Sequence, residues 1–562
     1  MRHRSETPRR ELNQRRLTAN LAENPVDAAT ISRDGKYVAY ADQRGIHVQL
    51  LQTGETRDLS QTEGLTPDSW FPDSTKLLAS AWPDQPRSGI WIISAFGGTS
   101  RRLREEGAVA LSSPDGSLIA FSSGFDRRTG FREIWLMGAG GDEAQKIAAG
   151  KEGEVLNPLA WSPDGTKIVC ARLHQDADKF EVYIESRGLT GNAIATILSD
   201  PNISGLVWLP NGRIIYSRPE SAWQARDADL WEIEVNEQTG KPVSKPRRIT
   251  NWAGFTLWGL SGSTDGKRLA IVRGTSQTDV YVGELEANGT RLRTPRRLTL
   301  DDWNDFPFSW TADSKAVLFA SDRNGNFDIF KQDIRQQSAE AIVTGPENEG
   351  QPRLSPDGSW ILYYESQKSA IPSTQARLMR VSTSGGAPQQ VLTARGYFDK
   401  QCSRLPANVC VYNETDAKNW VLYSFDPIRG KGRELLRVES GGFTSWGIAP
   451  DGSCIGLAME DPKTGHIRLL SLTGKPQRDI RFAGWGTLNS MDWDAAGKGM
   501  YVSSSPPGIG ATLLHVDLQG KVHVLWHQKG SPGTWGVASP DGRHLAILGS
   551  TNTGDAWLLE NF

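Results

Sequence analysis

Cysteine is scarce in this sequence, which holds four among 562 residues. Cys170, Cys402, Cys410 and Cys454 form no Cys-x-x-Cys pair, so the sequence excludes a disulfide scaffold. Cys402 and Cys410 flank a predicted turn at residues 405–408 and could face each other across a hairpin. We expect two free, buried thiols at these positions, with a disulfide as the alternative.

Long apolar runs and an excess of one charge are also absent. No stretch approaches about 18 consecutive apolar residues, so we expect no membrane span in this chain. Sixty-three basic residues stand against 65 acidic ones, a net charge of −2. This balance excludes a strongly basic surface and predicts no nucleic-acid partner.

The N-terminus departs from this balance. The segment MRHRSETPRRELNQRR has six Arg against two Glu and no apolar region behind it, so it is not a secretory signal peptide. We interpret residues 1–14 as a basic disordered arm, with a basic patch beside a membrane or nucleic acid as the alternative.

Catalytic and metal-binding signatures are missing as well. The sequence contains no G-x-S-x-G, no G-x-x-x-x-G-K-[ST], no HRD or DFG and no HExxH. The one histidine cluster is His515, His523 and His527, which a hairpin near residues 519–520 would bring partly together. We favour cross-strand pairing there over a metal site, and we interpret residues 322–326 as a turn because they lack calcium-loop spacing. The chain is therefore predicted not to be an enzyme, with no catalytic residue, cofactor or metal.

A short turn recurs along the chain instead. Its clearest copy is Ser113-Pro114-Asp115-Gly116, which an alternating strand follows at once. Proline presets the backbone, aspartate can accept a bond from its own backbone two residues on, and glycine closes the turn. Twelve copies occur, roughly 40–50 residues apart, at residues 32–35, 71–74, 113–116, 162–165, 209–212, 263–266, 311–314, 355–358, 405–408 (degenerate), 449–452, 494–497 and 539–542.

The repeated aspartates invite comparison with a carboxylate array. We favour a structural role, in which each one satisfies its own hairpin backbone. The predicted structural turns contain Asp34, Asp73, Asp115, Asp164, Asp265, Asp313, Asp357, Asp451 and Asp541. The 20 Trp residues could likewise be stacking platforms, but their regular placement favours packing between neighbouring sheets.

The repeat consists of the turn, an IAF-like strand, an IW or IY strand, a Gly-Gly pair and an RRLT strand. No segment keeps a 3.6-residue apolar period, so we predict an all-β chain. The unit resembles the TolB-type (WD40-like) β-propeller repeat. The resemblance implies two tandem six-bladed β-propellers, a first over residues 15–290 and a second over 291–562; a seven-plus-five split or one large open ring is the alternative.

Each ring is expected to close with an N-terminal strand, because closure removes exposed sheet edges. Residues 15–18 would complete blade six beside residues 280–282. Residues 296–299 would complete the last blade, whose third strand lies at residues 556–558.

Longer stretches, such as the run from Arg15 (RRLTANLAENPVDAATISRDGKYVAY), resemble the propeller half of large bacterial signalling proteins, notably of Acidobacteria. Those proteins carry a eukaryotic-like Ser/Thr kinase or winged-helix effector ahead of the propeller, and often a transmembrane helix. The resemblance implies a sensor and interaction module whose effector lies outside this chain, with a protein partner or small ligand at the channel mouths. The location would be periplasmic by this resemblance, and cytoplasmic if no signal or membrane segment precedes the chain. A propeller hydrolase or lyase with a channel-mouth site, and a TolB-like periplasmic scaffold, are the alternatives.

Overall fold

The computed structural model describes residues 12–562 except 84, 86, 127–129, 152–153, 176–179, 220–226, 368–374, 396–398, 416–418, 440–442, 473–476, 507–509 and 532. These residues form β-strands and two 3₁₀ turns, η1(Pro210–Gly212) and η2(Ala287–Gly289), and no α-helix. In the described part of the chain, no helix is long and apolar enough to cross a membrane.

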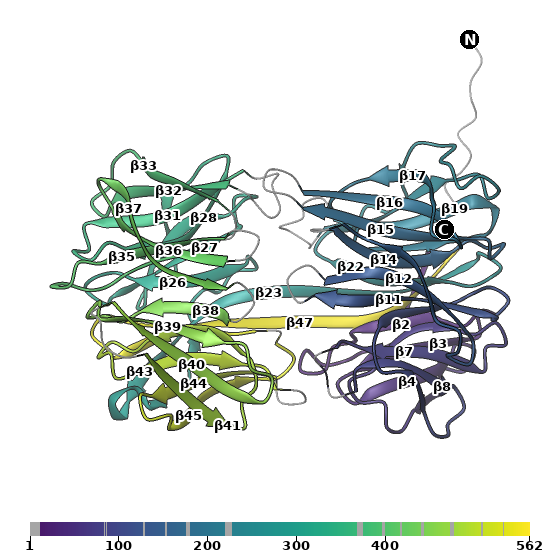
Figure 1. Ribbon diagram of the computed structural model, residues 1–562, viewed down its shortest axis with the longest axis horizontal. Coiled ribbons are helices and arrows are strands. Elements are labelled where there is room, and N and C mark those ends of the chain that lie inside the picture. The colour runs from purple at the N-terminus through teal and green to yellow at the C-terminus, as the bar shows by residue number, and fades with distance from the viewer. Residues whose placement is uncertain are drawn as a thin grey trace, which may run out of the picture. The chain divides into compact units, whose positions relative to one another are not determined.

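The strands build two six-bladed propellers, each with its own compact core (Figure 1). Five blades of the first propeller are four-stranded antiparallel sheets that follow the chain in order. They are β2(Ala28–Ile31), β3(Tyr37–Asp42), β4(Gly45–Leu50), β5(Thr56–Asp58); β6(Thr66–Trp70), β7(Lys76–Ala81), β8(Gly89–Ser94), β9(Arg101–Arg104); β10(Ala108–Ser112), β11(Leu118–Asp126), β12(Gly130–Gly138), β13(Gln145–Ala149); β14(Glu154–Trp161), β15(Lys167–Gln175), β16(Phe180–Gly188), β17(Ala193–Ser199); and β18(Gly205–Trp208), β19(Arg213–Pro219), β20(Ala228–Glu234), β21(Arg247–Arg248).

Five blades of the second propeller follow the same plan. They are β26(Asp305–Trp310), β27(Ala316–Ser321), β28(Asp328–Asp333), β29(Glu340–Val343); β30(Asn348–Leu354), β31(Trp360–Ser366), β32(Gln375–Ser382), β33(Gln389–Arg395); β34(Lys400–Cys402), β35(Cys410–Thr415), β36(Asn419–Asp426), β37(Gly430–Glu439); β38(Phe443–Ile448), β39(Cys454–Met459), β40(Thr464–Ser471), β41(Arg478–Ala483); and β42(Leu488–Trp493), β43(Gly499–Ser504), β44(Ala511–Asp517), β45(Val522–Gln528).

The sixth blade of each propeller uses strands that are distant in sequence. The sheet order is β1(Asn13–Arg16), β47(His544–Glu560), β23(Arg268–Glu286), β22(Thr256–Gly262). In the second propeller, β46(Gly536–Ala538) pairs with β47, while β24(Arg291–Leu292) and β25(Arg296–Arg297) pair with β23. The compact units divide β23 at residues 276/277 and β47 at 551/552, so both long strands contribute to both propellers.

This pairing corrects the expected closure. Residues 15–18 were expected beside residues 280–282, but Arg16 pairs with Trp557 in β47. Tyr281 pairs instead with Arg297 in β25. Each propeller is thus closed by an N-terminal strand, but the two third strands are exchanged. The predicted boundary at 290/291 assumed that each propeller is one continuous segment. In the structure, residues 277–290 belong to the second unit and residues 552–562 to the first.

An aspartate at the start of each third strand anchors the outer strand beside it. Arg16 lies 2.6 Å from Asp555, and the Thr18 hydroxyl donates to the same carboxylate at 2.9 Å. In the second propeller, Arg297 lies 2.7 Å from Asp279. The Arg-x-Thr motif therefore holds an outer strand against the aspartate of its neighbour. Both rings use the same pair of groups, so this contact does not by itself determine which strand closes which ring.

Tryptophans pack between neighbouring blades of a ring. The Trp70 indole N–H donates to the Thr30 carbonyl of the preceding blade at 3.1 Å, and Trp161 donates to Leu111 at 2.9 Å. Apolar residues of the middle strands complete the core; one cluster joins Val48 and Leu59 to Leu77 of the next blade. Because each blade buries its face only against the next, the ring is the smallest stable unit.

Two further predictions concern the arm and the cysteines. The arm was predicted over residues 1–14; residues 1–11 lie outside the described residues, and Asn13 and Gln14 belong to β1.

The prediction of free thiols at Cys402 and Cys410 is wrong, because the structure joins them in a disulfide with an S–S distance of 1.99 Å. Direct cross-strand pairing places their Cα atoms 4.0 Å apart, close enough for the sulfurs to bond.

Candidate functional site

The nine turn aspartates singled out from the sequence all make the same local contact. One carboxylate oxygen of each accepts the backbone N–H two residues on, at 3.0–3.2 Å, for Asp34, Asp73, Asp115, Asp164, Asp265, Asp313, Asp357, Asp451 and Asp541. Hydrogen bonds from the Ser113 and Ser117 hydroxyls lower the pKa of Asp115 to about 2. Oxygens engaged with their own turns are poorly placed to act on a ligand.

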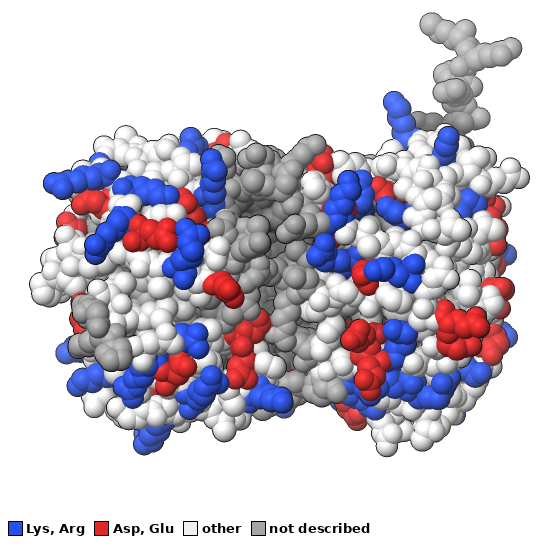
Figure 2. All heavy atoms as spheres, in the orientation of Figure 1, with Lys and Arg blue, Asp and Glu red and all other residues white. Residues whose placement is uncertain are grey.

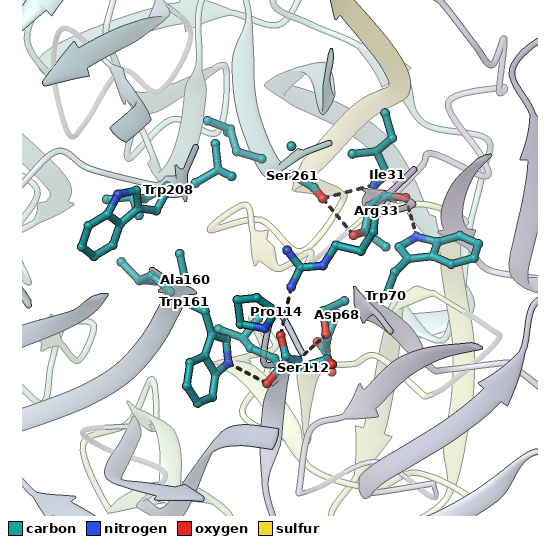
Figure 3. Close-up of a pocket in the computed structure, with 18 of the residues that line it drawn as sticks. Ile31, Arg33, Asp68, Trp70, Ser112, Pro114, Ala160, Trp161, Trp208 and Ser261 are labelled. Carbon is teal, nitrogen blue, oxygen red and sulfur yellow. Dashed lines mark hydrogen bonds between the residues drawn. The ribbon is translucent and has the colours of Figure 1, made fainter. Parts of the chain in front are cut away.

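The innermost strands of the first propeller enclose a cavity of about 350 Å³ (Figure 3). All six blades contribute to it, through β2, β6, β10, β14, β18 and β22 and the turns that follow these strands. Its walls include Leu111, Pro114, Trp161 and Trp208, together with several Ser and Thr side chains, one arginine and one aspartate. This size and this mixture of apolar walls with a few polar groups are typical of small-molecule sites.

Arg33 is the basic side chain of this lining. It stands at the second position of its turn, where the neighbouring copies have Pro72 and Pro114. Its guanidinium reaches across the cavity to the Ser112 carbonyl on β10, at 3.1 Å (Figure 3). Burial lowers the pKa of Arg33, and no carboxylate of the described residues lies within 4.0 Å of its nitrogens.

Asp68 is the carboxylate of the same lining. It lies at a β-bulge of β6, between Pro67 and Ser69, and accepts the Ala110 N–H at 3.1 Å. Burial raises the pKa of Asp68 to about 7, although hydrogen bonds from Ser80 and Ala110 act in the opposite direction. A carboxyl group that titrates near neutrality is suited to general acid–base chemistry.

The second propeller has a cavity of about 290 Å³ between its own inner strands. Arg353 on β30 and Asp492 on β42 form an ion pair of 3.0 Å within this lining. Arg404 donates to the Ala495 and Pro540 carbonyls, at 3.2 and 3.1 Å. The charged groups of this channel are therefore engaged with protein partners.

Arg404 also corrects the reading of the degenerate ninth turn. Ser403 exchanges hydrogen bonds with Val409, at 2.7 and 2.8 Å, as Ser32 does with Tyr37 in the first turn. The copy therefore begins at Ser403 rather than Leu405, with Arg404 at the second position. One arginine at this position in each propeller points into the channel of that propeller.

The histidine and calcium-like motifs build no ligand set. His515 and His523 are cross-strand neighbours, as the predicted hairpin requires, and the His515 ring lies 3.2 Å from Asp494. Asn324 and Asn326 donate their amide N–H groups to Asp328, so this carboxylate is engaged by its own loop. In the described ranges, no group of three or more His, Cys, Asp or Glu residues is arranged to hold a metal.

Sequence reasoning did not single out Arg33, Asp68, Arg353 or Arg404. A usable signal existed for Arg33, since arginine replaces the proline of the repeat there. Asp68 carried no comparable signal, because its importance follows from a bulge, from burial and from a hydrogen bond to the next blade.

Surface charge is mixed. On the face drawn in Figure 2, Lys and Arg are interspersed with Asp and Glu on each propeller, and neither sign gathers in one continuous patch. This agrees with the formal net charge of −2.

Comparison with known proteins identifies the repeat. The profile of the family described as "TolB beta propeller domain" matches residues 13–256 and 244–449. The tricorn protease is 13% identical with a TM-score of 0.34, and the alignment covers 88% of this chain and 49% of that chain. TolB from Acinetobacter baumannii is 11% identical (TM-score 0.20; 74% and 79% covered), and an oligogalacturonate lyase in complex with manganese is 12% identical (TM-score 0.30; 76% and 98% covered). This chain therefore spans about half the length of the tricorn protease, and at these identities the likeness concerns the fold alone.

The same comparison corrects the prediction that the chain is not an enzyme. The oligogalacturonate lyase, which this chain resembles at low identity, is an enzyme. Motif absence on a propeller therefore does not exclude catalysis, because function resides in the site rather than in the fold.

Proposed function

Because this chain belongs to the TolB β-propeller family, we propose that it is a ligand-binding sensor and interaction module whose ligand site is the channel of the first propeller. One observation carries the proposal: a cavity of about 350 Å³, bordered by all six blades, contains a partly buried arginine with no carboxylate partner among the described residues. A ligand in contact with six blades would stabilise the whole ring. A partner that binds the folded ring would then sense whether the ligand is bound.

The signalling role rests on the sequence resemblance to the propeller half of bacterial signalling proteins. A kinase or winged-helix effector would read the state of the propeller, either from the same gene or as a separate partner. Sequencing the DNA upstream of the Met1 codon tests this part of the proposal: an in-frame effector supports it, and an unrelated reading frame with no effector in the operon counts against it.

The channel assignment is tested by filling the cavity. Ala160 lines it, so A160F adds an aromatic ring inside the proposed site (Figure 3). A312F adds the same ring at the lining of the second channel and is the matched control. A small-molecule library is screened by thermal shift on the full chain: hits that A160F removes and A312F retains support the channel, whereas hits that survive A160F contradict it.

Catalysis in the same channel is the second candidate function. It is favoured by Asp68, whose carboxyl has a pKa of about 7 and lines the cavity that also holds Arg33. An esterase, lactonase, peptidase and lyase screen, run with the wild-type chain and with D68N, tests it. Turnover that D68N lowers by at least about tenfold, while circular dichroism shows the variant fully folded at the assay temperature, supports this function.

A further inference from the structure

We infer that the ligand of the first propeller's channel is a small organic monocarboxylate, with its carboxylate on Arg33 and its apolar body against the channel wall. This inference rests on the proposed ligand-binding function and names the chemical class of the ligand. It is carried by the unused donors of Arg33, by the contrast with the second channel, and by the composition of the wall.

Arg33 has donors to spare. A guanidinium carries five N–H donors in a planar fork, and one of them bonds the Ser112 carbonyl at 3.1 Å. No further acceptor within the described ranges bonds this side chain, and the cavity lies in front of it (Figure 3). A carboxylate matches the spacing of two parallel N–H donors, which makes it the natural occupant of such a fork.

The charge of Arg33 is also uncompensated. Asp68 shares the cavity, but it bonds the Ala110 N–H and lies beyond ion-pair distance of Arg33. Removing a cation from water without a counter-ion costs free energy. An anion that binds beside Arg33 would offset this cost, which favours its binding. One positive charge calls for one negative charge, which favours a monocarboxylate over a phosphate dianion.

The second channel shows what a satisfied arrangement looks like. Arg353 forms an ion pair with Asp492 at 3.0 Å. Arg404, at the second position of its turn, donates to two backbone carbonyls. Arg404 is therefore the matched counterpart of Arg33: it has the same place in the repeat, yet its contacts are made within the protein.

The composition of the cavity wall indicates the polarity of the rest of the ligand. Leu111, Pro114, Trp161 and Trp208 present carbon surface to the cavity. Of the indole N–H groups in the lining, those of Trp161 and Trp70 are held by the Leu111 and Thr30 carbonyls. The Trp208 N–H is the one without a partner in the described ranges. An aromatic or branched aliphatic body fits such a wall better than a polar one.

The test compares acids with their neutral amides. The full chain is titrated calorimetrically with benzoate, 4-methylpentanoate, benzamide, 4-methylpentanamide and phenyl phosphate. We expect at least one acid to bind tenfold or more tightly than its amide, R33Q to abolish that preference, and R404Q to retain it. R33K keeps the charge without the fork, so it is expected to retain part of the preference and guards against a folding defect in R33Q.

Three results would overturn the inference: equal binding of acid and amide, no binding of either acid, or tighter binding of phenyl phosphate than of both acids. Failure of the proposed function looks different. Library hits that A160F removes but R33Q leaves unchanged overturn the carboxylate assignment and leave the channel function standing. Hits that survive both substitutions overturn the channel itself as the ligand site.

Discussion

Arg353 Nη1 lies 3.0 Å from Asp492 Oδ2, and this ion pair joins β30 to β42 inside the second propeller. The two side chains are about one-fifth exposed, at 18% and 20%, so solvent screens their attraction only in part. Two blades, β34–β37 and β38–β41, separate the two strands in sequence, and the ion pair joins them across the cavity lining.

The first prediction concerns this pair. R353M leaves Asp492 as an unpaired, largely buried charge and is expected to lower the free energy of unfolding by about 2–4 kcal/mol. The double substitution R353M/D492L removes both charges and should recover most of that loss. Urea denaturation followed by tryptophan fluorescence measures both. R293M, which removes an exposed ion pair to Glu284, is the control and should leave the midpoint nearly unchanged.

The second prediction concerns ring closure. D555N removes the ion pair with Arg16 and weakens the bond from Thr18, at an expected cost of about 1–3 kcal/mol. Hydrogen exchange should rise at residues 13–18 and stay unchanged at 296–299. D279N is the matched variant and should do the reverse, because Arg297 pairs with Asp279. Faster exchange of residues 13–18 in D279N would contradict the exchanged strands.

The third prediction separates a hydrogen bond from packing. Trp161 and Trp208 both line the first channel; the Trp161 N–H is bonded to Leu111, while the Trp208 N–H is buried without a partner in the described ranges. W161F should therefore destabilise the chain by about 1 kcal/mol more than W208F. Thermal unfolding of the two variants checks this, and equal losses would show that packing alone decides the effect.

The fourth prediction concerns pH. Burial raises the pKa of Asp68 from 3.8 to about 7, so the folded chain binds this proton more tightly than the unfolded chain. The contribution to stability is complete below about pH 4, decreases as the pH rises, and is lost above about pH 7. D68N lacks this titration, so its stability relative to wild type should rise by roughly 1–3 kcal/mol between pH 4 and 7.

The control for this measurement is D73N, in the exposed turn of the same blade. Urea denaturation at several pH values should show no matching rise for D73N between pH 4 and 7. A flat difference between wild type and D68N over the same interval would contradict the raised pKa.

Local features of the chain were readable in advance because they depend on neighbours in sequence. The turn at Asp115 and the strands on either side of it follow from the conformational preferences of proline, aspartate and glycine. The hairpin that pairs His515 with His523 was expected for the same reason, and the strand register confirms it. The disulfide was not expected, since a pair of cysteines around a turn is compatible with either redox state until the strands are in register.

The site was less readable. The first turn differs from most other copies by having Arg33 where they have proline. Nothing in the local sequence shows that this side chain enters a channel or lacks a carboxylate partner. Asp68 is one aspartate among many, and its raised pKa comes from burial, which only the folded ring produces.

The sequence by itself determined that this protein is built from twelve β-meanders that must stack, because turn chemistry and strand alternation act over a few residues. Only the tertiary structure decided which strand closes which ring and which charges share a cavity. Asp279 and Asp555 open similar third strands, so the choice between them depends on contacts far apart in the chain. The same holds for Arg33, whose surroundings come from six separate blades.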